Sequence, residues 1–542
     1  MTLQPVERRF LVWLVSAVIL ITSAPYIFGW IATPANRTYT GIHRLTPGDI
    51  AVYYSFIEQG RQGKPVSENL FTSEPQVPSV LTPQWFIVGQ LAHLFHLPTV
   101  LAYQLTRIFF VILFLILAYH FIAGLLPALR LRMIALTTIA FATGFGAFVP
   151  IRDMAYAVQH LALPIDTWVP ESFPFISLYH NPLFLMGLCG ILSVLLLVER
   201  RLEQGDRAAA WFASGLTLIL AIIHPYDVFL LAAILGSLLV LRLAVKFHGA
   251  RAHLGGDVKV LCQVLGPAVL ALGIIRIIFQ VQPALTGWAA QNVTLSPGLG
   301  WYVPAYLVPV TLALAGVRAT LRLQSTRALV VLAWAGVVPL LLYLPFFPYQ
   351  RRMMEGWFIA LVVLGTTGLA GIWARVKPRL SPIAQSGLAS AAVTLGILLF
   401  GITSVTHLVK DAYYASFGSE PVSIPRGLTD AFTWVRSHTD DDAIVLARPY
   451  DANLLPGWTA RRTYYGHDDL TAESKRKDRE VEAFFTPAAD IDAHGFLQRE
   501  RITYILIRQH DSNALRAMVQ RDVPLENVYA NADATVFHVV AE

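Results

Sequence analysis

Cysteine and charge are both scarce in this chain. Of its 542 residues, two are cysteines, 14% are charged and 55% are hydrophobic. Because Cys189 and Cys262 are the only cysteines, a disulfide framework and a cysteine metal centre are excluded. A mean hydropathy of +0.55 makes the chain too apolar for an ordinary soluble protein.

Several short motifs of soluble enzymes are missing as well. In the polar C-terminal region, no glycine-rich phosphate loop follows a predicted strand and no nucleophile elbow occurs, so a nucleotide-binding or hydrolase role is unsupported there. The formal net charge of +6 comes from basic residues beside hydrophobic segments, not from one basic stripe, so nucleic acid is not an expected partner. No paired histidine spacing of a transition-metal site occurs among the polar residues considered below.

Long apolar runs recur along most of the chain. Each run has about 18–22 residues, which as a helix crosses a hydrocarbon core of about 30 Å. The runs are continuous and do not alternate with polar residues, which favours membrane helices over a barrel. We expect about eleven spans, at Phe10 to Ile31, Thr99 to Leu125, Met133 to Val149, Leu178 to Val198, Ala208 to Ile223, Val228 to Lys246, Val260 to Val281, Tyr302 to Leu321, Ala328 to Phe347, Trp357 to Ala374 and Gly387 to His407.

Basic residues predict the orientation of these spans. Arginines and lysines, beginning with Arg8 and Arg9, gather in alternate connections, which the positive-inside rule assigns to the cytoplasm. The N-terminus is therefore expected inside and the C-terminal region outside the plasma membrane. The first segment has no clear cleavage site, so we interpret it as a retained signal anchor.

The predicted architecture is a polytopic α-helical membrane protein with a C-terminal soluble α/β domain. Residues 1–409 form the multi-pass domain, which includes a long extracytoplasmic first loop at 33–98, and residues 410–542 form the soluble domain. In the loop, Ile50 to Gln59 and Pro83 to Phe95 predict helices lying along the membrane interface. The soluble domain has helix patterns at Gly427 to His438 and Lys475 to Phe485, and strand patterns at Ala443 to Ala447, Tyr504 to Arg508 and Thr535 to Val540.

Polar residues from five connections are predicted to gather on the outer side of the membrane. Charges of both signs that converge on one membrane face suggest a substrate site, whereas a single charge at a helix end does not. This set comprises Asp49, Arg152, Asp153, Glu171, His180, His224, Tyr226, Asp227, Arg351, Arg352 and Glu355.

Asp49 lies in Pro47-Gly48-Asp49, inside the long first loop. An ionised carboxylate near an acceptor hydroxyl can take its proton as a general base. The alternative is that Asp49 is the N-cap of the helix that begins at Ile50. The two roles are compatible.

Two other parts of this set have a functional and a structural interpretation. Arg351 and Arg352 suit a lipid-linked phosphate, because guanidinium groups bind phosphate through paired hydrogen bonds; headgroup contact or pairing with Glu355 is the alternative. His224 and Asp227 are three residues apart and could share a ligand or a metal; the alternative is a helical hairpin turn.

His467 belongs to a dense run of hydrogen-bonding residues in the soluble domain, Arg461 to Asp469. This run could cover the membrane site or hold a sugar. It could equally be a solvated loop.

These residues resemble the GT-C superfamily of integral-membrane glycosyltransferases, particularly bacterial relatives of protein mannosyltransferases and lipopolysaccharide-modifying sugar transferases. The matching features are an early acid at Asp49 in an outer first loop, in-plane helices in that loop, many membrane helices, an arginine at 351 or 352 before a late span, and an α/β tail. The resemblance implies transfer of a sugar, commonly with inversion, from a polyprenyl-phosphate donor to a lipid, glycan or protein acceptor outside the cytoplasm.

The resemblance also implies roles for single residues. Asp49 becomes the general base, and Arg351 or Arg352 a ligand of the carrier phosphate. Many relatives carry paired acids in the first loop, whereas Ile50 and Ala51 follow Asp49, so a metal bound by such a pair is not predicted and any cofactor stays unknown. Asp153 is a possible second acid.

A membrane transporter or lipid flippase is the alternative function. It would favour repeated halves and polar residues at mid-membrane. The sequence shows no evident internal repeat, and its polar residues are predicted at the outer surface.

Overall fold

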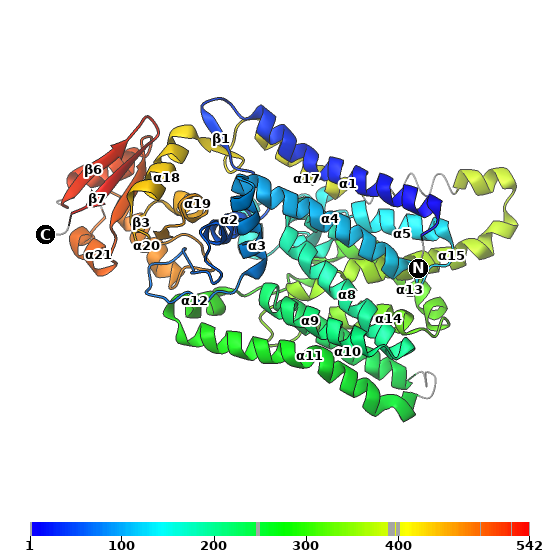
Figure 1. Ribbon diagram of the computed structural model, residues 1–542. Coiled ribbons are helices and arrows are strands. Elements are labelled where there is room, and N and C mark those ends of the chain that lie inside the picture. The colour runs from blue at the N-terminus through cyan, green and yellow to red at the C-terminus, as the bar shows by residue number, and fades with distance from the viewer. Residues whose placement is uncertain are drawn as a thin grey trace. The chain divides into compact units, whose positions relative to one another are not determined.

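The computed structural model describes residues 3–244, 250–388, 396, 401–487, 489–521 and 523–540 (Figure 1). These form two compact units. Unit 1 comprises Met1–Ala24, Thr106–Gly273 and Thr294–Lys410, and unit 2 comprises Pro25–Leu105, Ile274–Val293 and Asp411–Glu542. Lys246 and most of the predicted span Gly387 to His407 lie outside the described residues.

Seven helices in the described part of the chain are long and apolar enough to cross a membrane. They are α1 (Pro5–Ala32), α4 (Thr99–Ala123), α8 (Pro182–Gln204), α10 (Tyr226–Ala244), α11 (Ala250–Val281), α13 (Val303–Leu321) and α15 (Trp357–Val376). Two shorter apolar helices, α9 (Arg207–Ile223) and α14 (Thr326–Leu341), match two further predicted spans. The protein is therefore an integral membrane protein that crosses the bilayer several times.

The predicted third span, Met133 to Val149, is wrong in its C-terminal half. Helix α5 (Leu129–Phe141) ends eight residues earlier than expected, and only a short 3₁₀ turn, Gly146–Phe148, follows it. Gly144 and Gly146 stand where the helix was expected to continue, and glycine is a poor helix former. A helix of 13 residues is about 20 Å long, too short to cross the bilayer straight.

The predicted turn at His224 and Pro225 is confirmed. Helix α9 ends at Ile223, and α10 begins at Tyr226. Proline has no backbone N–H to donate, so Pro225 separates the two helices. This turn fixes His224 and Asp227 at the adjoining ends of α9 and α10.

Helices α13 and α15 pack backbone against backbone. A methyl group added at Gly368 would lie 2.8 Å from the Gly316 nitrogen and 2.8 Å from the Leu312 carbonyl oxygen. Small residues allow such close approach between membrane helices, where packing rather than the hydrophobic effect drives association.

We expect Gly368→Ala to destabilise the protein by about 1–3 kcal/mol, because the methyl group meets main-chain atoms that cannot move aside. The measurement is the melting temperature in detergent. Gly371→Ala is the matched control, since a methyl group at Gly371 in the same helix meets no atom within 4 Å. Equal melting temperatures for the two variants would contradict the packing argument.

Arg107 is buried inside unit 1, although it lies within a membrane-crossing helix. Its guanidinium donates hydrogen bonds to Thr22 Oγ1 at 3.0 Å, Ser23 Oγ at 2.9 Å and the Leu178 carbonyl at 2.9 Å. The cost of burying this charge is offset by hydrogen-bond acceptors on two other segments. Arg107 thus holds α1 and α7 (Pro174–His180) against α4.

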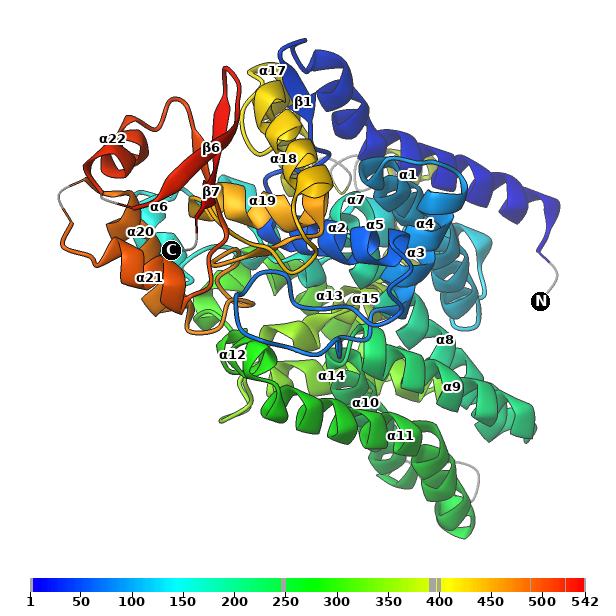
Figure 2. The ribbon, with the colours of Figure 1, turned by 60° about the vertical axis from the view of Figure 1, so that its left-hand side comes forward.

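Unit 2 brings the first loop together with the C-terminal region. Helices α2 (Pro47–Arg61) and α3 (Pro83–Leu94) confirm the two helices predicted in the loop. Helix α19 (Pro449–Thr459) packs on α2 (Figure 2), and strand β1 (Arg37–Tyr39) pairs antiparallel with β2 (Ser423–Pro425). The loop is therefore part of the same compact unit as the C-terminal region.

The C-terminal sheet has five strands in the order β4-β3-β5-β7-β6. Strands β4 (Arg462–Thr463), β3 (Ile444–Leu446) and β5 (Tyr504–Arg508) run parallel, while β7 (Ala534–Val539) is antiparallel to both β5 and β6 (Leu525–Ala530). Buried residues from β3 and β5 form one apolar core with side chains of α20 (Ser474–Phe485) and α22 (Ser512–Gln520). The remaining α-helices of the described residues are α6 (Met154–Gln159), α12 (Pro283–Gln291), α17 (Ile402–Ser416), α18 (Arg426–His438) and α21 (Ala493–Arg499). The predicted α/β domain is confirmed.

Candidate functional site

Asp49 lies in the first turn of α2 and is not its N-cap. The predicted capping role is wrong, because the helix begins at Pro47, whose fixed φ suits the first helical position, and Thr46 takes the N-cap position. A carboxylate in the first turn is stabilised by the helix dipole. The Asp49 side chain is 38% exposed and therefore accessible to a substrate.

His467 is the ion-pair partner of Asp49 within unit 2. Its Nε2 lies 3.6 Å from Asp49 Oδ1, and its Nδ1 accepts a hydrogen bond from the Asp469 backbone N–H at 3.1 Å. Nδ1 is an acceptor, so in the neutral ring the proton is on Nε2 and faces Asp49. Burial lowers the pKa of His467, but the contact with Asp49 and the charges of Asp469 and Asp468 outweigh burial, so the pKa is raised.

This raised pKa predicts a pH-dependent contribution to stability. The folded chain holds the His467 proton more tightly than the unfolded chain, whose histidine pKa is about 6.5. The contribution is therefore fully present below about pH 6.5 and is lost as pH rises through the folded pKa. We expect wild type to melt a few degrees above His467→Gln at about pH 6, with the gap in melting temperature closing as pH rises through the folded pKa of His467.

The control for this measurement is His510→Gln, which removes an exposed histidine from the same unit. Its melting temperature should follow that of wild type across the range. If the difference in melting temperature between wild type and His467→Gln widened with rising pH, the raised pKa of His467 would be contradicted.

Glu171, whose side chain is buried, forms an ion pair with the half-buried Arg352 in unit 1. Arg352 comes from the 3₁₀ turn Arg351–Met354 just before α15, and its guanidinium also lies over the rings of Tyr226 at 5.3 Å and Phe184 at 5.5 Å. The Glu171 side chain is 1% exposed, so it depends on Arg352 for its charge balance. The structure thus brings together three residues of the predicted set, Glu171, Arg352 and Tyr226.

The rest of the predicted set has different surroundings. Arg351 is half-buried, with its guanidinium 4.6 Å from the centre of the Trp168 ring. Arg152 is exposed, and Asp153 is the N-cap of α6, where it accepts the Tyr156 backbone N–H at 2.9 Å. His180 is buried at the end of α7.

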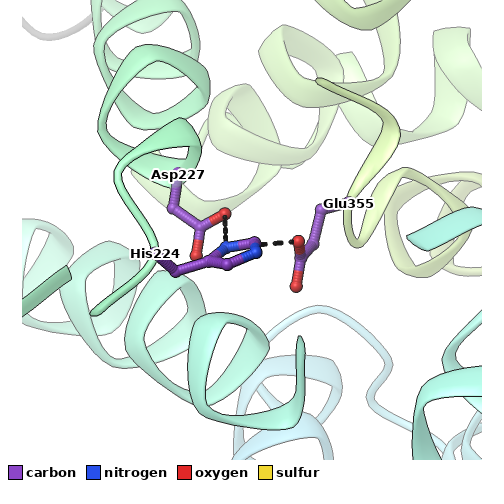
Figure 3. A group of neighbouring side chains, drawn as sticks. All are labelled: His224, Asp227 and Glu355. Carbon is purple, nitrogen blue, oxygen red and sulfur yellow. Dashed lines mark ion pairs between the residues drawn. The ribbon is translucent and has the colours of Figure 1, made fainter. Parts of the chain in front are cut away.

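His224, Asp227 and Glu355 form a second buried group in unit 1 (Figure 3). His224 Nδ1 lies 2.9 Å from Asp227 Oδ1 and 3.6 Å from Glu355 Oε2. All three side chains are at most 3% exposed, and one ligand atom from each lies within 4.8 Å of the others. Nitrogen and carboxylate oxygen in this arrangement could hold a metal ion.

The link between Glu355 and His224 could not be read from the sequence. Glu355 lies three residues after Arg352, which suggested the arginines as its partners, whereas the structure pairs it with a histidine from the α9–α10 turn. The sequence did contain one signal, the position of the acid Glu355 beside a predicted membrane span. A charged side chain at such a position is energetically costly, so it rarely lacks a partner. The ring of Phe184 lies 5.4 Å from that of His224 and beneath Arg352, so it connects this group to the Glu171 pair.

The arrangement of apolar helices with a sheet-containing C-terminal domain is the GT-C fold of membrane glycosyltransferases. Three solved structures share it. The apo oligosaccharyltransferase of Archaeoglobus fulgidus is matched with a TM-score of 0.58 and 13% identity, over 92% of this chain and 69% of that one. ArnT from Cupriavidus metallidurans is matched with a TM-score of 0.50 and 13% identity, over 97% and 98% of the two chains.

The third structure is the arabinofuranosyltransferase AftD from Mycobacteria, with a TM-score of 0.52 and 12% identity. The match covers all of this chain and 40% of AftD. No protein-family model and no curated protein sequence matches the chain. At these identities the likeness establishes the fold, and fold alone does not establish an activity.

Proposed function

We propose that the protein transfers a sugar from a polyprenyl-phosphate-linked donor to an acceptor outside the cytoplasm. The observation that carries the proposal is a partly exposed carboxylate, Asp49, held by His467 in the first-loop helix of a GT-C fold. The Archaeoglobus oligosaccharyltransferase has been solved with a dolichol-phosphate and, separately, with a tethered acceptor peptide. A protein with this fold thus binds a lipid phosphate, which supports a lipid-linked donor for this chain.

Asp49 is proposed as the general base. Its carboxylate takes the proton of an acceptor hydroxyl while that oxygen bonds to the anomeric carbon and the bond from this carbon to the carrier phosphate oxygen breaks. One displacement of this kind inverts the anomeric configuration. His467 is a positioning residue, since its Nε2 proton faces Oδ1 of Asp49.

The carrier phosphate is proposed to bind the arginines before α15. A guanidinium offers a fixed positive charge and paired donors to phosphate, which also stabilise the charge that develops on the departing phosphate. Arg351 is the better candidate, because Arg352 is already committed to the buried carboxylate of Glu171. Tyr226 lies beneath Arg352 and supports its orientation.

The orientation of the chain in the membrane is also part of the proposal. The alternating basic connections support a cytoplasmic N-terminus and an outer C-terminal region. Asp49 would then act on the outer side of the membrane, where acceptors of the cell envelope are found.

The test is a transfer assay with purified protein, radiolabelled polyprenyl-phosphate sugars, and lipid, glycan and peptide acceptors. We expect label to move to one acceptor class with inverted configuration. Protein in vesicles that moves solute or lipid across the bilayer, and transfers no sugar from any donor, would establish a transporter or flippase instead.

A further inference from the structure

We propose that unit 1 binds one divalent cation of the manganese or zinc class through His224 Nδ1 and one carboxylate oxygen each from Asp227 and Glu355. This inference concerns binding and does not depend on the proposed transferase activity. The three ligands come from the α9–α10 turn, the first turn of α10 and the residue before Gly356 at the start of α15. Figure 3 shows the three side chains converging.

The charges in this group do not balance without a cation. Asp227 and Glu355 are both 1% exposed and both contact His224, while the nearby Arg352 is already paired with another acid, Glu171. Burying an uncompensated charge costs on the order of several kcal/mol per ion. A divalent cation removes this imbalance.

Hydrogen bonding does not satisfy the group either. Both carboxylate oxygens of Asp227, both of Glu355 and Nδ1 of His224 are buried without a hydrogen-bond partner among the described residues. The 2.9 Å approach of His224 Nδ1 to Asp227 therefore lacks the alignment of an N–H···O bond. Nitrogen and oxygen ligands that lie this close together without hydrogen-bond partners are suited to a metal ion.

The spacing also fits a metal. With bonds of about 2.1 Å, neighbouring ligands stand about 3.0 Å apart in octahedral and about 3.4 Å apart in tetrahedral geometry. The observed separations from Nδ1 are 2.9 Å and 3.6 Å. One imidazole with two carboxylates favours manganese or zinc over magnesium or calcium, which prefer oxygen alone.

Gly187 in α8 keeps the space beside the ligands open. A methyl group there would lie 2.5 Å from Asp227 Oδ2, 2.9 Å from Glu355 Oε1 and 3.2 Å from His224 Nδ1. A side chain at this position would press on all three ligands. Gly187→Ala therefore tests the cavity without changing a ligand.

The experiment titrates chelator-treated protein in detergent with Mn²⁺ and follows free Mn²⁺ by electron paramagnetic resonance. We expect wild type to bind one ion per chain, and Asp227→Asn, Glu355→Gln and Gly187→Ala to bind at least about tenfold more weakly. Glu199→Gln is the matched control and should bind as wild type does, because Glu199 is an acid of the same unit paired with Arg327. Zn²⁺ competition for bound Mn²⁺ then ranks the two metals.

A melting experiment distinguishes binding from misfolding. In metal-free buffer, Asp227→Asn and Glu355→Gln should melt above wild type, because each removes a buried like charge. Added Mn²⁺ should reverse this order by stabilising wild type alone. Absence of Mn²⁺ or Zn²⁺ binding to wild type, or binding that all three site variants retain, would overturn the proposal whether or not the protein transfers sugar.

Discussion

Asp49→Asn should lower the turnover of sugar transfer by about 10²–10⁴-fold, the usual contribution of a general base. Asparagine has nearly the same shape, and its amide oxygen can still accept the Nε2 proton of His467, so the fold of α2 is retained. What is lost is the capacity to accept a proton from the acceptor hydroxyl. The measurement is turnover at saturating donor and acceptor.

Asp430→Asn is the matched control for this prediction. Asp430 is an exposed acid on α18 in the same unit, so its replacement removes the same charge from a different surface. The control should keep wild-type turnover, and His467→Gln should lose less than Asp49→Asn because it removes only positioning. Equal turnover of Asp49→Asn and wild type would disprove the base assignment while leaving the transferase activity itself intact.

Arg352→Gln is expected to destabilise the protein by about 3–5 kcal/mol, the cost of leaving one partner of a buried pair without its counterion. Glu171 is 1% exposed and would be left as an unbalanced carboxylate. Its melting temperature in detergent should fall well below that of wild type. Adding Glu171→Gln to Arg352→Gln should recover part of the loss, because the double variant has no unpaired charge at this pair.

Arg351→Gln should behave in the opposite way, although it is the neighbouring residue. Its guanidinium lies over the Trp168 ring, an interaction that contributes only about 0.5–2 kcal/mol. We expect near-normal melting with a raised KM for the donor, because the variant lacks a phosphate ligand.

The prediction for Arg352 has a separate test. If Arg352→Gln melts as wild type does, or if the double variant with Glu171→Gln is no more stable than Arg352→Gln, the pairing of Arg352 with the buried Glu171 does not stabilise the fold.

The C-terminal domain and the spans were largely predictable because their signals are local. Strand β5 matches its predicted bounds, and α18, β3, α20 and β7 lie within a residue or two of theirs, since period and hydrophobicity are read from neighbouring residues. The Asp49 capping role was wrong for a similarly local reason. Pro47 can open a helix, so the helix starts two residues before Asp49 instead of after it.

The partners of the polar residues were not predictable in this way. Arg352 and Glu355 are close in sequence, yet the structure pairs Arg352 with Glu171, 181 residues away, and Glu355 with His224. Asp49 meets His467 from the far end of the chain. No periodicity or composition records such pairs.

The sequence alone determined that this is a multi-pass membrane protein with an α/β tail, because apolar length and alternation are properties of continuous segments. It also supplied the acids, arginines and histidines of both candidate sites. Only the tertiary structure decided that His467 contacts Asp49, that Arg352 pairs with the buried Glu171, and that Glu355 lies beside His224 and Asp227. Such contacts depend on helix packing across long stretches of chain, and packing is fixed only when the segments meet.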